Sequence, residues 1–251
     1  MRTTSRRAWR VVGGGVGAAT LLGLGYVATQ WLRYGHVRKR RGPPTLLDRF
    51  LPECEVLEQH QTRVAAPADV TFAAAREMSL AASPVVRAIF RGRELLMRSS
   101  VPERAAEQPS RSLLDEVLSI GWGVLAQEPG REIVLGAVTQ PWKSHVKFRA
   151  LPPDEFAAFD TPGFAKIAWT IRAEPLGFAT SRFFTETRVA TTDPEARKRF
   201  RRYWTLVSPG VRLIRRESLR LVRADAERRF RGDVDTTSPW QSLPRRDRHR
   251  R

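Results

Sequence analysis

The sequence has very few of the residues that form metal sites and disulfide bonds. It contains one cysteine and four histidines in 251 residues, so an internal disulfide is excluded. His36, His60, His145 and His249 lie far apart, and no His-x3-His or Cys-x2-Cys spacing occurs. We therefore predict that the chain has no metal site and needs no cofactor.

Signatures of nucleophilic and nucleotide chemistry are also missing. The Gly-x-Ser-x-Gly pattern of serine hydrolases does not occur. The glycine-rich stretch at residues 13–17 is not followed by Gly-Lys-Ser/Thr, so it is not a phosphate-binding loop. Cys54 is a solitary thiol, a residue that is more often structural than catalytic. No catalytic constellation is evident, and the sequence leaves open whether the protein is an enzyme.

Acidic residues are scarce relative to basic ones, and the excess of basic residues lies towards the two ends of the chain. The sequence has 44 Lys and Arg against 26 Asp and Glu, a formal net charge of +18. Residues 1–49 carry a net charge of +9 and residues 193–231 a net charge of +8, whereas residues 50–192 carry −1. A nearly neutral body between basic segments favours a domain held against an anionic surface.

An uncharged run, VVGGGVGAATLLGLGYVAT, occupies residues 11–29. A helix of about 20 residues spans the hydrocarbon core of a bilayer, and Trp, Tyr and Arg flank this run. We predict a single transmembrane helix over residues 11–31; a removable signal peptide and a flexible glycine-rich segment are the alternatives. The basic block at residues 38–41 favours a single-pass protein of the cell membrane whose domain faces the cytoplasm.

Composition divides the chain into five segments. Residues 1–10 are a basic N-terminus, residues 11–31 the predicted anchor and residues 32–50 a basic linker. Residues 51–231 are enough for one folded domain, and residues 232–251 are predicted to be a disordered basic tail.

The first half of the domain reads as a strand, two short helices and a hairpin. Residues 55–64 have the pattern of a strand. Asp69 is a plausible helix N-cap, and Ser83-Pro84 resembles a second helix start. Residues 122–127 and 132–138 flank a Pro-Gly turn and predict an antiparallel hairpin.

The second half predicts a longer hairpin followed by a long helix. Its strands are expected at residues 164–173 and 178–192, with a turn at residues 174–177. Apolar residues recur at helical spacing from Asp193-Pro194 onward, and Pro209-Gly210 predicts a kink or a break. Most strands follow one another in the sequence and the helices are segregated from them, which indicates an α+β fold.

Short motifs along the domain resemble, in order, those of the START/Bet v 1-like superfamily, also called SRPBCC or polyketide cyclase/dehydrase-like. They are APADVTF at 66–72, GREIVLG at 130–136, FAKI at 164–167, TETRV at 185–189 and RFxxYW at 199–204. The resemblance covers residues 51–226. It implies a helix-grip fold, in which a curved antiparallel sheet wraps around a long C-terminal helix. A cavity for an apolar ligand lies between the sheet and the helix. Some members catalyse cyclisation or dehydration there.

Candidate cavity residues are mostly aromatic, because ligand sites are chiefly apolar with a few polar groups. Alternation along a strand puts Phe184, Glu186 and Arg188 on one face. If that face looks into the cavity, the ion pair could orient a ligand carboxylate or hydroxyl. The ligand-cavity candidates are Trp122, Trp142, Phe148, Trp169, Phe184, Glu186, Arg188, Tyr203 and Trp204.

These observations together predict a membrane-anchored domain that binds a hydrophobic small molecule, such as a lipid. One alternative is a cyclase- or dehydratase-type enzyme that uses Glu186 as general acid or base. Another is a basic nucleic-acid-binding protein, but no recognition-helix or stacking motif is present, so no nucleic-acid partner is expected.

Overall fold

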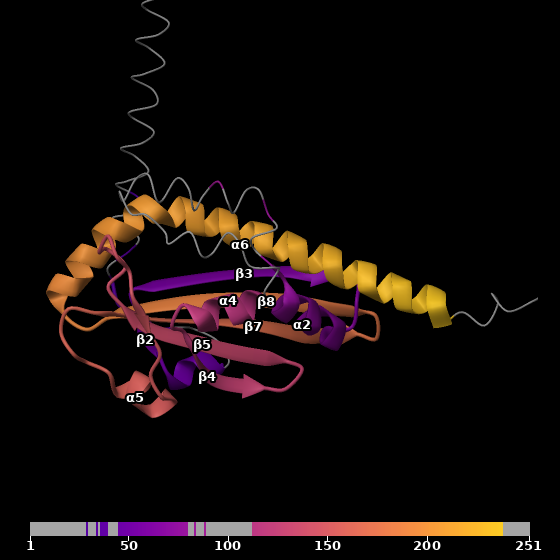
Figure 1. Cartoon of the computed structure of the whole chain (residues 1–251), viewed down its shortest axis with the longest axis horizontal. Helices are drawn as coiled ribbons and strands as arrows, with labels where there is room; N and C mark the ends of the chain where they lie inside the picture. The colour runs from indigo at the N-terminus through magenta and orange to yellow at the C-terminus, as the bar shows by residue number, and fades with distance from the viewer. Residues whose placement is uncertain are drawn as a thin grey trace, which may run out of the picture.

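The computed structural model describes residues 29, 34, 36–39, 45–79, 83, 88 and 112–237. An antiparallel sheet has the strand order β3-β8-β7-β5-β4, and β6 pairs with β5 at its edge. Figure 1 shows this curved sheet with the long helix α6 lying along it. The elements are β1 (Arg38–Lys39), η1 (Leu46–Arg49), β2 (Glu53–Cys54), β3 (Val56–Val64), α2 (Ala68–Glu77), α4 (Leu113–Ser119), β4 (Gly123–Glu128), β5 (Glu132–Thr139), β6 (Phe148–Arg149), α5 (Pro153–Ala158), β7 (Ala165–Gly177), β8 (Thr180–Thr191) and α6 (Pro194–Thr237).

Both predicted hairpins are present. The β4–β5 hairpin turns at Gly130, whose φ of +71° suits glycine. The β7–β8 hairpin turns later than predicted, because β7 continues through Pro175 to Gly177. A register shift between these two residues places the proline in an irregular part of the ladder, where a missing amide donor is tolerated.

The last helix is longer and more continuous than predicted. α6 runs without interruption from Pro194 to Thr237, with Pro209 inside it, and it bends in its first half (Figure 1). Proline removes one backbone hydrogen bond at a cost of about 3 kcal/mol. Packing offsets that cost on both sides of Pro209, because Phe200 before it and Val222 after it are buried on the same sheet.

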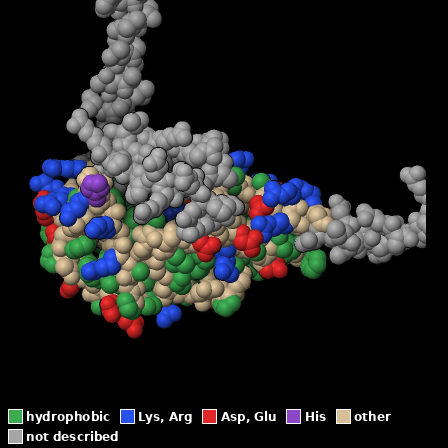
Figure 2. All heavy atoms as spheres, in the orientation of Figure 1, with side chains coloured by type: hydrophobic (Ala, Val, Ile, Leu, Met, Phe, Trp, Pro, Cys, Tyr) green, Lys and Arg blue, Asp and Glu red, His purple; other side chains and the backbone are tan. Residues whose placement is uncertain are grey.

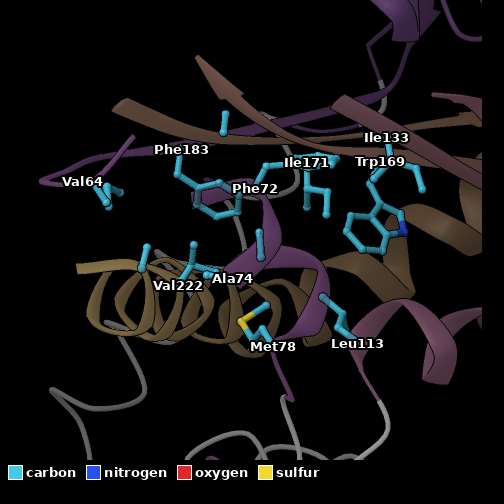
Figure 3. Close-up of a cluster of buried hydrophobic side chains, with 14 of the residues drawn as sticks. Val64, Phe72, Ala74, Met78, Leu113, Ile133, Trp169, Ile171, Phe183 and Val222 are labelled. Atoms are coloured by element: carbon cyan, nitrogen blue, oxygen red, sulfur yellow. The ribbon is translucent and has the colours of Figure 1, made fainter. Parts of the chain in front are cut away.

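Two apolar layers cover opposite faces of the sheet. α2, α4 and the second half of α6 pack on one face, and Figure 3 shows Phe183, Ile171 and Trp169 pointing from the strands toward these helices. On the other face, η1 and α5 bury Leu47 and Phe156 against β5. The predicted helix at Ser83-Pro84 falls, except for Ser83 and an isolated helical residue at 88, outside the described residues.

The structure corrects the prediction of a membrane protein. Within the described ranges, no helix combines the length and the apolar character needed to cross a bilayer. The longest helix, α6, carries arginine throughout its length. Residues 11–31, predicted as the anchor, lie outside the described residues apart from Thr29. The predicted single-pass location in the cell membrane, with the domain facing the cytoplasm, is therefore wrong on this finding.

Candidate functional site

The two faces of the sheet are distinguished by what covers them. On β7, Trp169, Ile171 and Ala173 belong to the apolar cluster with α2 and α6, whereas Ala168 belongs to the cluster with η1. Side chains alternate along a strand, so these four residues fix the face of every paired position. We call the face toward α2 and α6 the grip face and the opposite one the outer face.

Three of the predicted cavity residues meet on the grip face. The ring centroid of Trp122 lies 5.2 Å from that of Phe148 and 6.3 Å from that of Trp169. The chain corner before Trp122 makes this contact possible, because Gly121 has a φ of +103°. A Cβ atom at Gly121 would lie 2.3 Å from the carbonyl oxygen of Phe148. Glycine at position 121 therefore allows the ring of Trp122 to approach the ring of Phe148.

Another three candidates gather around the first half of α6. Trp142, Tyr203 and Trp204 pack in a cluster that also contains Phe200 and Tyr34. The rings of Phe200 and Trp204 are stacked with centroids 5.6 Å apart. This cluster is distinct from the one that holds Trp169, so the six aromatic candidates on the helix side form two groups.

The remaining candidates, Phe184, Glu186 and Arg188, lie on the outer face. Phe184 is covered by the guanidinium of Arg172, 4.8 Å from its ring centroid. Glu186 and Arg188 are both fully buried. The sequence correctly groups these three on one face of β8, but that face is turned away from α6.

A dense polar network surrounds Arg188 under η1. Its Nε donates to Glu186 Oε1 at 2.5 Å and its Nη1 donates to the carbonyl oxygen of Leu51 at 2.7 Å. Asp48 completes the ion pairs at 2.7 Å. The second oxygen of Glu186 accepts from Gln59 at 2.7 Å. The buried charges are thus paired and hydrogen-bonded, which fastens η1 to the sheet.

The grip face carries polar side chains at one edge and apolar ones at the other. Glu58 and His60 of β3 lie opposite Thr187 and Thr185 of β8. The residues that pair with these threonines on β7, and the residues that follow them on β5, are apolar. Two rows result, Glu58–Thr187–Trp169–Leu135 and His60–Thr185–Ile171–Ile133.

Helix α6 places two arginines, one turn apart, over the polar edge. Arg212 donates to Tyr34 Oη at 2.5 Å and to Glu58 Oε1 at 3.3 Å. Tyr34 also donates to Glu58. Burial raises the pKa of Tyr34, and the adjacent Glu58 carboxylate raises it further. Tyr34 therefore acts here as a neutral donor, and Glu58 is matched by one cation.

The second arginine, Arg215, has a different environment. Its Nη2 donates to Thr187 Oγ1 at 2.9 Å, and its guanidinium lies 5.0 Å from the centroid of Trp169. It keeps some exposure to solvent, yet desolvation by the surrounding protein lowers its pKa to about 10. No carboxylate among the described residues lies within ion-pair distance of Arg215.

On the strands of the grip face, Nε2 of His60 and Oγ1 of Thr185, whose residue is 2 % exposed, make no hydrogen bond in the described structure. The Nε2 atom lies 3.9 Å from Glu58 Oε2. The indole Nε1 atoms of Trp142 and Trp204, on the helix side, are likewise without a hydrogen bond. Desolvation lowers the pKa of His60, Glu58 opposes this shift, and the cations Arg215, Arg216 and Arg212 add to it. His60 is thus held as a neutral imidazole beside the buried hydroxyl of Thr185.

A separate cleft of about 440 Å³ opens between α2, α4 and the β4–β5 turn. None of the predicted cavity residues lines it. Its walls are formed by Asp69, Phe72, Ala73, Arg76, Glu77, Ser112, Leu114, Asp115 and Gly130.

Basic side chains are prominent on the surface but many are paired. Figure 2 shows Lys and Arg gathered at one end of the molecule and over α6, with Asp and Glu close by. Along α6, Arg220 pairs with Glu217 at 2.7 Å and Arg223 with Glu227 at 3.0 Å. In the part of the chain that the structure describes, no group of three His, Cys, Asp or Glu side chains could hold a metal ion.

Sequence reasoning missed the polar members of the grip face. Alternation separates Thr185 and Thr187 from Glu186, but it does not say which set meets the helix. Arg215 is one of thirteen basic residues between positions 193 and 231, and nothing local distinguishes it. The available signal was the spacing of Arg212 and Arg215, which places both on one side of a helix.

Comparisons with known proteins give structural neighbours only. No family model matches the chain, and no curated protein matches it. The di-domain aromatase/cyclase BexL is 16% identical to this chain, with a TM-score of 0.26. The match covers 68% of this chain and 46% of BexL, so this chain spans less than half the length of BexL. The Zhui aromatase/cyclase from Streptomyces sp. R1128 is 16% identical with a TM-score of 0.24, covering 69% and 94% of the two chains. Norcoclaurine synthase from Thalictrum flavum is 11% identical with a TM-score of 0.26, covering 80% and 98%.

The architecture itself identifies the fold. An antiparallel sheet is formed by β3, β8, β7, β5 and β4, and the 44-residue helix α6 lies along one face of it. α2 packs against the same face and against α6. This is the α+β helix-grip fold that the START/Bet v 1-like resemblance implied.

Proposed function

We propose that this domain binds a hydrophobic small molecule between the grip face and α6. The observation that carries the proposal is the convergence of Trp122, Phe148 and Trp169 on one face, directly beside a row of polar side chains. Sites for small molecules combine an aromatic and aliphatic wall with a few polar groups that fix orientation. The lipid-like ligand predicted from the sequence is a small molecule that such a site would suit.

Two measurements on the intact chain test the proposal. Native mass spectrometry of the purified protein should reveal a co-purified small molecule as a mass shift that disappears on denaturation. Titration with the neutral fluorescent probe N-phenyl-1-naphthylamine should give saturable binding. Trp169→Leu should weaken probe binding about tenfold, because it removes an aromatic surface from the site.

A matched control removes an aromatic residue elsewhere. Phe178 is 94% exposed at the tip of the β7–β8 hairpin, so Phe178→Ser should leave probe binding unchanged. Equal affinities in the wild type, Trp169→Leu and Phe178→Ser would place the probe outside the grip face. No saturable binding and no co-purified mass would refute the proposal.

The enzyme alternative gains no support from the position of Glu186. One carboxylate oxygen is bound by Arg188 and the other by Gln59, on the face turned away from α6. A general acid or base needs access to the proton that it transfers. The absence of a nucleic-acid partner stays a prediction.

A further inference from the structure

We infer that the ligand of this domain carries a carboxylate at its polar end and that Arg215 binds it. The inference rests on the proposed function, because it specifies the ligand that would occupy the grip face. It assigns the two ends of the ligand to the two edges of the sheet. The apolar body lies on Trp122 and Trp169, and the carboxylate lies over β3 and β8.

The charges of the described site do not balance without an anion. Glu58 is matched by Arg212 at 3.3 Å, and Tyr34 donates a neutral hydrogen bond to the same carboxylate. His60 is kept neutral by desolvation and by the nearby arginines. Arg215 then remains as a positive charge with no carboxylate in contact among the described residues, and the neighbouring cation, Arg216, is exposed to solvent. One monoanion would complete the site.

The indole under Arg215 positions its guanidinium without neutralising it. At 5.0 Å from the centroid of Trp169, the guanidinium makes a cation–π contact. The hydrogen bond to Thr187 Oγ1 uses one of five N–H donors. A planar guanidinium held by a ring on one side and a hydroxyl on the other is arranged for bidentate recognition of a carboxylate.

Two further polar groups adjoin this position and make no hydrogen bond in the described structure. Thr185 precedes Thr187 by two residues on the same face of β8, and its Oγ1 has no hydrogen-bond partner in the described structure. His60 lies directly across from Thr185 on β3, and its Nε2 makes no hydrogen bond, although Glu58 Oε2 lies 3.9 Å away. A buried hydroxyl left unpaired costs free energy that a ligand oxygen would recover.

Isothermal titration calorimetry of the intact chain with two isosteric probes tests the inference. The probes are 2-naphthoate, a carboxylate, and 2-naphthamide, its neutral counterpart. The wild type should bind 2-naphthoate about tenfold more tightly, since a hydrogen bond to a charged group is stronger than a neutral one. Arg215→Met should abolish the preference, so that the variant binds 2-naphthoate and 2-naphthamide with similar affinity. Arg216→Met, which removes an exposed charge at the next position, should keep the preference.

The possible outcomes separate the two proposals. Equal binding of both probes by the wild type would overturn the carboxylate inference and leave the proposed function standing. The same conclusion follows if Arg215→Met keeps the preference. Binding of neither probe would refute both. If Arg215→Met fails to fold, Arg215→Lys serves instead, and a reduced but retained preference supports the inference because Lys keeps the charge without the planar donors.

Discussion

The buried network around Arg188 gives a prediction about stability. Arg188→Met removes a fully buried guanidinium and leaves Glu186 as an uncompensated charge inside the protein. Breaking a buried ion pair on one side costs about 3–5 kcal/mol. The lost contacts to Asp48 and to the carbonyl oxygen of Leu51 favour the upper part of that range. Because small proteins unfold with about 5–15 kcal/mol, the variant should fold but be much less stable.

Urea denaturation followed by circular dichroism measures this effect. With a slope of about 2 kcal/mol per molar urea, the midpoint of Arg188→Met should fall by about 2 M. The double variant Glu186→Gln/Arg188→Met should regain part of the loss, since no unpaired charge stays buried at position 186. Arg182→Met is the control on the same strand, because its partly exposed pair with Glu174 should contribute less than about 1 kcal/mol.

The reasoning is refuted if Arg188→Met costs no more than Arg182→Met. It is also refuted if the double variant is less stable than Arg188→Met, since that would mean Glu186 needs no partner. Binding of 2-naphthoate should be unaffected by Arg188→Met under conditions where the variant is folded. The network and the grip face lie on opposite sides of the sheet.

The remaining predictions concern three glycines and a histidine. Gly121→Ala should lower the free energy of unfolding by about 3 kcal/mol or more, because it adds a clash with Phe148 to a strained φ. Gly130→Ala, at a φ of +71° with open space around it, should cost only about 1–2 kcal/mol, and equal losses in urea titrations would contradict this. Gly136→Ala should lower the free energy of unfolding by about 1–3 kcal/mol, because the added Cβ would lie 2.4 Å from Leu125 Cδ1. An unchanged urea midpoint would contradict this and show that the Leu125 side chain moves aside at no cost. The pKa of His60 is lowered in the folded state, so as the pH falls this histidine is protonated in the unfolded chain before it is protonated in the folded one. The free energy of unfolding should therefore decrease below about pH 6.5, by at most about 1.4 kcal/mol per pH unit. His60→Gln should flatten that slope between pH 7.5 and 5.5, and parallel slopes would refute this origin.

The strands were predictable because their patterns are local. β-branched and aromatic residues with turns between them located both hairpins, and the cap-plus-proline signal located the start of α6 at Pro194. α4 was not predicted, although Ser112 caps it by accepting from the amide of Asp115, since a seven-residue helix leaves little periodic signal. Of the kink or break predicted at Pro209, the break does not occur: α6 continues through this residue and bends in its first half. Tertiary packing on both sides of Pro209 outweighs one lost hydrogen bond.

The site was less predictable than the fold. Trp122, Phe148 and Trp169 were chosen as aromatic residues, and the structure brings them together. Glu186 and Arg188 were chosen as a charged pair on one strand face, but the identity of that face depends on which elements cover it. η1, which precedes the predicted domain of residues 51–231, covers this face and contacts Arg188 through Asp48. Long-range coverage of this kind leaves no trace in the local pattern.

The division of the grip face into rows has a consequence for how specificity can diverge. The polar edge is built from β3, β8 and α6, and the aromatic edge from β6, β7 and the corner at Gly121. If Arg215 binds the polar end of a ligand as proposed, exchanging it for a neutral residue would change which polar group is bound and leave the aromatic edge intact. Two proteins descended from this chain could then share one apolar surface and differ in the polar group that each recognises.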